Sequence, residues 1–186
     1  MTIYEYVEPE RFVAGTVGEP GERTFYLQAH DGDRTTSVSL EKGQVAILAE
    51  RLNDLLDALL RQSGGALSIP AVVLADQQDR EPLEAPIHDD FRAIGLSLMW
   101  DDEIDRVVVE AHSVDESEDA PEPAAAEERV RPETLRVVMT GLAARAFVAR
   151  AQSVVSAGRP PCPFCSLPLD PAGHICPRQN GHRRRP

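Results

Sequence analysis

The sequence lacks the features that would place it in a membrane or outside the cell. Its 186 residues contain no run near the roughly 18 consecutive apolar residues that a membrane-spanning helix needs. The first residues, MTIYEY, lack the basic and apolar blocks of a secretory signal peptide. We therefore expect a cytoplasmic protein that does not associate with membranes.

Positive charge and common catalytic motifs are also scarce. Lys and Arg total 19 against 31 Asp and Glu, and the net charge of −12 disfavours a protein that coats nucleic acid or an anionic membrane. No serine lies in a Gly-x-Ser-x-Gly elbow, and no Gly-x-x-x-x-Gly-Lys phosphate loop occurs. These absences favour a protein without catalytic activity.

What the sequence does contain is strand and helix patterning, in two successive halves of about residues 10–62 and 91–157. Each half is expected to form three strands followed by one helix. The expected strands and helices are 11–17, 24–29, 35–40 and 41–61 in the first half, and 92–100, 106–111, 134–140 and 141–157 in the second. The fold class is therefore α+β: residues 1–158 form a body of two β-β-β-α halves, an antiparallel sheet with helices on one face.

The repeated order of elements also suggests an internal duplication, although few residues are identical between the halves. Apolar residues in both halves, among them Phe25, Trp100 and Phe147, are interpreted as core. The segment 66–90 between the halves contains three prolines, so it is not expected to form a long regular element. Residues 71–74 are the part of it that fits a short strand.

A strongly acidic segment interrupts the second half. Between Asp115 and Glu133 there are eight acidic and two basic residues. Their net charge of −6 is half of the −12 that the whole chain carries. The segment has little to bury and is expected to be a mobile loop over residues 113–133. A solvated spacer is the simpler interpretation, and a docking surface for a basic partner is the alternative.

All three cysteines fall within fifteen residues near the C-terminus, in the basic segment 159–186. In a chain without a secretory signal, clustered cysteines indicate a metal site rather than disulfides. The expected ligands of one structural Zn²⁺ ion, in a zinc ribbon or knuckle, are Cys162, Cys165, His174 and Cys176. Because only one residue separates His174 from Cys176, His182 remains an alternative fourth ligand.

A four-ligand zinc site has no open position for substrate, so it indicates a structural and not a catalytic metal. We expect a zinc-binding adaptor or regulatory protein that acts through protein–protein contacts. Two alternatives remain: an enzyme on a phosphorylated or thiol-containing metabolite, or a protein that binds nucleic acid through its tail. The candidate partner-binding residues in the tail are Arg178, Arg183, Arg184 and Arg185.

Residues at both ends of the chain resemble an uncharacterised actinobacterial family of conserved hypothetical proteins, a domain of unknown function. The resemblance lies in FVAGTVGEPGERTFYLQ at 12–28, LEKGQV at 40–45, GRPPCPFC at 158–165, LPLD at 167–170 and GHICPRQNG at 173–181. It implies a soluble cytoplasmic protein whose gene lies near those of a histidine-phosphatase-like protein, a protein that resembles phosphatidylinositol kinases and a mycothiol-synthesis ligase. The resemblance therefore implies that the kinase-like or the phosphatase-like protein is a partner.

Overall fold

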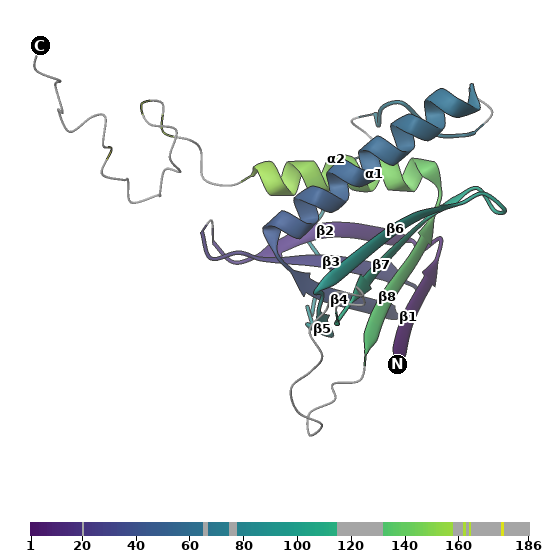
Figure 1. The fold of residues 1–186 in the computed structure, drawn as a ribbon. Coiled ribbons are helices and arrows are strands. Elements are labelled where there is room, and N and C mark those ends of the chain that lie inside the picture. The colour runs from purple at the N-terminus through teal and green to yellow at the C-terminus, as the bar shows by residue number, and fades with distance from the viewer. Residues whose placement is uncertain are drawn as a thin grey trace, which may run out of the picture.

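The protein contains two four-stranded β-sheets and two α-helices (Figure 1). The computed structural model describes residues 1–19, 21–64, 67–74, 78–114 and 132–157, together with Cys162, Phe164 and Cys176. In chain order the elements are β1 (Thr2–Val7), β2 (Arg11–Val17), β3 (Thr24–Asp31), β4 (Arg34–Leu40), α1 (Lys42–Ser63), β5 (Phe91–Arg92), β6 (Gly95–Asp101), β7 (Arg106–His112), β8 (Glu133–Met139) and α2 (Gly141–Ser156).

The two sheets have the same construction. Sheet I has the order β2-β3-β4-β5, and sheet II has the order β6-β7-β8-β1. In each, three consecutive strands form an antiparallel meander, and a fourth strand joins the last of them in parallel. The fourth strand comes from the other half of the chain: β1 joins the second meander, and β5 joins the first.

The hydrogen-bond register extends this equivalence to single residues. Phe91 of β5 faces Val38 of β4, and Tyr6 of β1 faces Val137 of β8. Val38 and Val137 each lie two residues before the end of their strand. Both aromatic side chains are buried in the core, so the two halves exchange equivalent strands with equivalent aromatic anchors.

Each helix follows the last meander strand of its half after a single capping residue. At α1, the side chain of Gln44 accepts a hydrogen bond from the backbone N–H of Glu41, and at α2 the hydroxyl of Thr140 accepts one from the N–H of Ala143. Such caps satisfy polar groups that have no partner inside the helix. The helices pack against each other. Each also packs on the sheet of the other half, since α2 lies on β2 of sheet I and α1 lies on β6 of sheet II.

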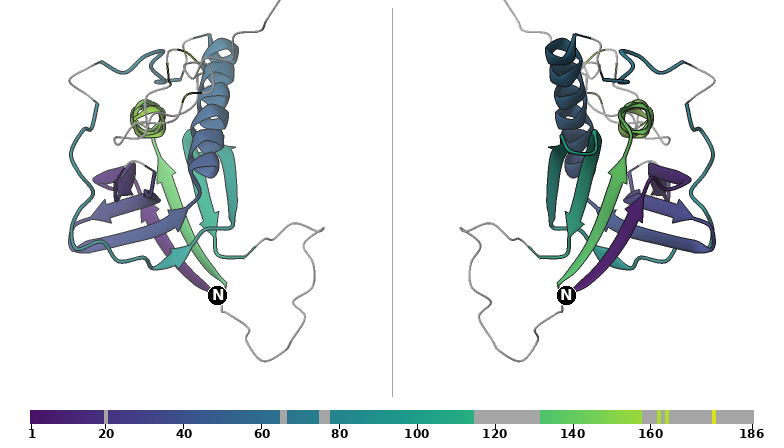
Figure 2. Two further views of the ribbon diagram at one scale, coloured as in Figure 1. Left: turned by 90° about the vertical axis from the view of Figure 1, so that its left-hand side faces the viewer. Right: turned by 90° about the vertical axis from the view of Figure 1, so that its right-hand side faces the viewer.

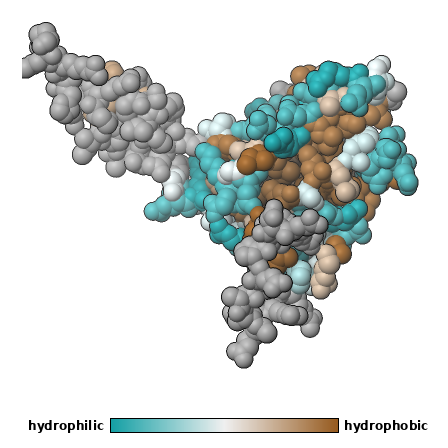
Figure 3. Space-filling model, viewed as in Figure 1, coloured by the Kyte–Doolittle hydropathy of each residue, from teal (hydrophilic) through white to brown (hydrophobic). Residues whose placement is uncertain are grey.

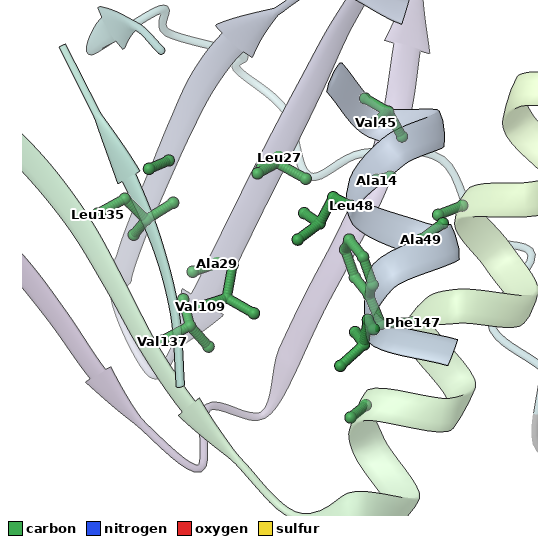
Figure 4. Close-up of a cluster of buried hydrophobic side chains, with 14 of the residues drawn as sticks. Ala14, Leu27, Ala29, Val45, Leu48, Ala49, Val109, Leu135, Val137 and Phe147 are labelled. Atoms are coloured by element: carbon green, nitrogen blue, oxygen red, sulfur yellow. The ribbon is translucent and has the colours of Figure 1, made fainter. Parts of the chain in front are cut away.

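The hydrophobic core lies between the facing sides of the two sheets and beneath the helices (Figures 2 and 4). Leu27 in the middle of sheet I and Val109 in the middle of sheet II are both almost fully buried. The helices contribute a stripe of apolar residues at helical spacing. Its buried members are Val45, Leu48, Ala49, Leu52 and Leu56 on α1, and Ala144, Phe147, Val148 and Ala151 on α2.

The prediction of an α+β fold from three-strand, one-helix halves is confirmed. The prediction of one antiparallel sheet with helices on one face is wrong, because the meanders form two sheets and each gains a parallel strand. Residues 71–74 are not a strand, and neither β1 nor β5 was predicted. Most of the predicted acidic loop and of the predicted zinc-binding tail lies outside the described residues.

Candidate metal site and binding surfaces

Two of the predicted zinc ligands lie side by side. Cys162 and Cys176 are 4% and 3% exposed, and their Sγ atoms are 3.8 Å apart. That distance far exceeds the length of a disulfide bond, about 2.05 Å. The two cysteines lie fourteen positions apart in the sequence.

The sulfur–sulfur distance is the one expected for two thiolates on a single zinc ion. With Zn–S bonds of about 2.3 Å and tetrahedral angles, two sulfur ligands lie about 3.8 Å apart. The other predicted ligands, Cys165 and His174, and the alternative His182 lie outside the described residues. Within the described part of the chain there is no group of three or more His, Cys, Asp or Glu side chains suited to a metal.

The arginines of the tail cannot be placed either. Arg178, Arg183, Arg184 and Arg185 lie outside the described residues, so their role in partner binding stays a prediction. Of the parts of the chain that the structure does describe, none forms a helix both long enough and apolar enough to cross a membrane.

A partly buried charge cluster that the sequence did not predict joins three distant segments. Asp79 accepts hydrogen bonds from Arg11 Nε at 2.5 Å and from Arg150 Nη1 at 2.6 Å. The hydrogen bond from Arg11 lowers the pKa of Asp79, whereas burial lowers the pKa of Arg150. Arg150 also donates to the carbonyl oxygen of Ala14 on β2. The cluster thus ties β2, α2 and the segment between the halves together.

A cavity of about 330 Å³ lies beside this cluster. Its apolar wall includes Phe12 and Phe147, whose stacked rings are 4.8 Å apart between centroids. Arg11 also donates to Glu84 and to the carbonyl oxygens of residues 81 and 82. Because the guanidinium is already engaged with the protein itself, we interpret the cluster as an anchor and not as an anion-binding site.

The enzyme alternative places its site in segment 66–90 or between the two halves, and a deep pocket that gathers His88, Asp89 or Arg92 would favour it. Instead, Asp89 accepts a hydrogen bond from the backbone N–H of Ser39 at 3.0 Å, and Arg92 forms an ion pair with Glu41. The cavities of about 330, 220 and 310 Å³ in the described part of the chain are lined by other residues. The cavity of about 330 Å³ does lie between segment 66–90 and the two halves, since Asp79, Phe12 and Phe147 line it, so the enzyme alternative stays a prediction.

The outer face of sheet II is a further surface that the sequence did not predict. Ion pairs link Glu5, Arg136 and Glu110 across three neighbouring strands. On one side of this charged row, Val7 and Met99 are 64% and 51% exposed. Figure 3 shows the molecule from the side on which sheet II faces the viewer, with hydrophobic and hydrophilic side chains interspersed. The sequence signal that could have predicted β1 is the alternation of its side chains, because Tyr4 and Tyr6 pack on the core.

Comparison with protein families gives one match. The model of a family described as "Protein of unknown function (DUF3090)" covers residues 4–176. The chain belongs to this family. No curated protein and no solved structure matches the chain at a significant level. The family match spans both halves and reaches Cys176, so the body and the paired cysteines fall within the same family region.

Proposed function

We propose that this member of the family is a zinc-binding, non-catalytic protein that acts through protein–protein contacts in the cytoplasm. The observation that carries the proposal is the 3.8 Å separation of the buried Cys162 and Cys176 sulfur atoms. A reducing compartment such as the cytoplasm keeps thiols available for a metal. Cys165 and His174 complete a closed ligand set, with His182 as the alternative to His174.

The first test measures bound metal in the purified full chain. Wild type should carry about one zinc ion per chain, and Cys162→Ser should lose it because a thiolate ligand is removed. Ser156→Ala, just outside the proposed site at the end of α2, is the matched control and should retain the ion. Unchanged zinc content in Cys162→Ser would refute the metal site.

The histidine ligand can be decided in the same assay. His174→Ala should release zinc, whereas His182→Ala should retain it. The opposite result would assign the fourth position to His182 and leave the zinc proposal intact.

The second test concerns the partner. The proposed zinc module carries Arg178 and the arginines at 183–185, and their positive charge suits an acidic protein surface. The partners expected from the resemblance are the kinase-like and histidine-phosphatase-like proteins. Titration calorimetry with each purified protein should give binding to the wild type and none to a Cys162→Ser/Cys165→Ser variant. Equal binding by both chains, or no binding by either, would contradict an adaptor role for the module.

A further inference from the structure

The cavity beside the Asp79 cluster has the composition of a small-molecule site. Its volume of about 330 Å³ lies within the range for such sites, roughly 300–1,000 Å³. Met139 and the partly exposed Phe12 belong to its apolar wall, and both acidic and basic side chains line it as well. An apolar wall with a few polar groups is typical of cavities that bind small molecules.

The equivalent place in the first half of the chain holds a side chain. When the helices are aligned on their capping residues, Gln44 of α1 corresponds to Ala143 of α2. The amide of Gln44 donates hydrogen bonds to the carbonyl oxygens of Ala93 and Ile94, in the turn between β5 and β6, at 3.4 and 2.9 Å. The methyl group of Ala143 cannot reach the equivalent turn, between β1 and β2. The cavity therefore lies where the second half lacks the side chain that joins helix and turn.

The turn between β1 and β2 also lines the cavity, and its backbone is strained. It contains three residues, 8–10, whereas the equivalent turn between β5 and β6 contains two. Glu8 has a φ of 49°, in the left-handed region that residues other than glycine rarely adopt. Its carboxylate accepts a hydrogen bond from Arg106 Nε of β7 at 2.6 Å, which holds the turn in this conformation. Backbone strain of this kind is concentrated at functional sites.

The positive groups at the cavity are already engaged by the protein. Arg11 binds Asp79, Glu84 and two carbonyl oxygens, as described above. Arg150 donates to the carboxylate of Asp79 and to the carbonyl oxygens of residues 14, 79 and 81. The side of α2 that lines the cavity includes residues 143, 146, 147 and 150, but not residues 141 and 142, whose N–H groups have no partner within the helix. An anionic ligand would therefore find few free donors here.

The carboxylates at the cavity are less fully engaged. The side chain of Glu10 is 66% exposed, and within the described residues its ionic contact is with His30, at 3.9 Å between Oε2 and Nε2. Three carboxylates and two guanidinium groups line the cavity, which gives the lining a net charge of −1. Together with the net charge of −12 on the whole chain, this favours a positively charged ligand.

We propose that the cavity binds a small organic cation, an amine carried on a flat apolar group. The apolar group packs on the ring of Phe12, and the ammonium group lies beside the carboxylate of Glu10. A ligand in this position contacts α2 and the β1–β2 turn together, so its binding stabilises the folded body. Neither Cys162 nor Cys176 lines the cavity, so this inference goes beyond the proposed zinc-binding function and does not depend on it.

The experiment titrates the purified full chain, in a buffer free of amines, with 2-phenylethylamine, benzylamine and tryptamine. Binding is followed by ligand-observed NMR. Each amine is compared with the alcohol and the carboxylate that carry the same apolar group. At least one amine should bind saturably and about fivefold more tightly than both of its analogues, because only the ammonium group pairs with Glu10.

Two substitutions fill the cavity with the side chains that stand at the equivalent positions of α1. Ala143→Gln introduces the counterpart of Gln44, and Ala146→Ile introduces the counterpart of Ile47. Each should weaken binding of the amine at least about tenfold, because the space for the apolar group is lost. Circular dichroism shows whether each variant is folded, and either folded variant is sufficient for the test.

Glu10→Gln should remove the preference for the amine over the alcohol. Glu19→Gln, at an exposed position between β2 and β3, is the matched control and should keep it. No saturable binding of any amine up to about 10 mM would overturn the proposal. So would unchanged affinity in folded Ala143→Gln or Ala146→Ile, an unchanged preference in Glu10→Gln, or tighter binding of the carboxylates. Because zinc content is measured separately, failure here leaves the metal site untouched.

Discussion

Leu83 occupies the space that a side chain at Gly15 would need. A Cβ atom built on Gly15 would lie 2.5 Å from Cγ of Leu83, inside any permitted contact. The glycine on β2 and the leucine in the segment between α1 and β5, 68 residues later in the chain, are therefore fitted to each other. The stretch around Leu83 and Glu84 therefore packs on sheet I as a structural layer and is not a simple linker.

This fit predicts the effect of Gly15→Ala. The added methyl group must displace Leu83, so we expect a loss of about 1–3 kcal/mol in the free energy of unfolding, measured by urea denaturation. The loss should be smaller when Leu83→Ala is already present, because that change makes room. Gly43→Ala is the control, since nothing lies within 4 Å of a Cβ there. Equal losses in both backgrounds would mean that the two residues are independent.

The Asp79 cluster predicts a pH-dependent contribution to stability. Asp79→Asn removes the charge that two guanidinium groups share, and we expect it to cost about 1–3 kcal/mol at pH 7. The native pKa of Asp79 is lowered, first by its hydrogen bond from Arg11. The contribution is therefore complete above the unfolded pKa of about 3.9 and is lost as the pH falls through the lower native value.

Urea unfolding of wild type and Asp79→Asn between pH 7 and pH 3 checks the direction of this pH dependence. The difference between the two proteins should be constant from pH 7 to about pH 5 and should shrink below about pH 4. Asp54→Asn on the exposed side of α1 is the control. A difference that grew toward low pH would contradict the assigned ion pairs.

A hydrogen bond between the two sheets gives a third prediction. The hydroxyls of Tyr6 on β1 and Thr36 on β4 are 2.9 Å apart and buried. Tyr6→Phe leaves the Thr36 hydroxyl buried without this partner, at a cost of about 1–3 kcal/mol in urea denaturation. Adding Thr36→Val should restore most of the loss, because both polar groups are then gone. No recovery in the double variant would show that the bond does not couple the sheets.

Local patterning was sufficient to predict the meanders and helices. The alternation of Phe25, Leu27 and Ala29 and the helical stripe that includes Leu48 and Leu52 both point to the core, as predicted. The parallel pairing of β1 with β8 was not predictable in this way, because the strands are more than 120 residues apart. A two-residue strand such as β5 has no periodicity at all. These two strands add the fourth, parallel strand to each three-stranded meander.

The candidate sites show the same difference between local sequence patterns and contacts that form only in the folded chain. The cysteine spacing predicted Cys162 and Cys176 as zinc ligands; their sulfur atoms lie 3.8 Å apart, and zinc binding itself stays a prediction. The Asp79 cluster could not be predicted, because Arg11, Asp79 and Arg150 carry no local motif and meet only through the tertiary fold. Only the register shows that the exposed Met99 on sheet II is the equivalent of the buried Gly15 on sheet I.

Removal of zinc by a chelator gives a fourth prediction, which separates the metal site from the body. The buried core cluster runs from Tyr6 to Ala151 and includes neither Cys162 nor Cys176. Strands and helices should therefore persist in the circular dichroism spectrum after chelation, and cooperative thermal unfolding should still occur. Zinc release, followed in the same sample with a colorimetric indicator, is the control that the metal has left. Loss of the cooperative transition together with the metal would mean that the body needs zinc to fold, as small zinc fingers do, and that the core between the two sheets is not sufficient.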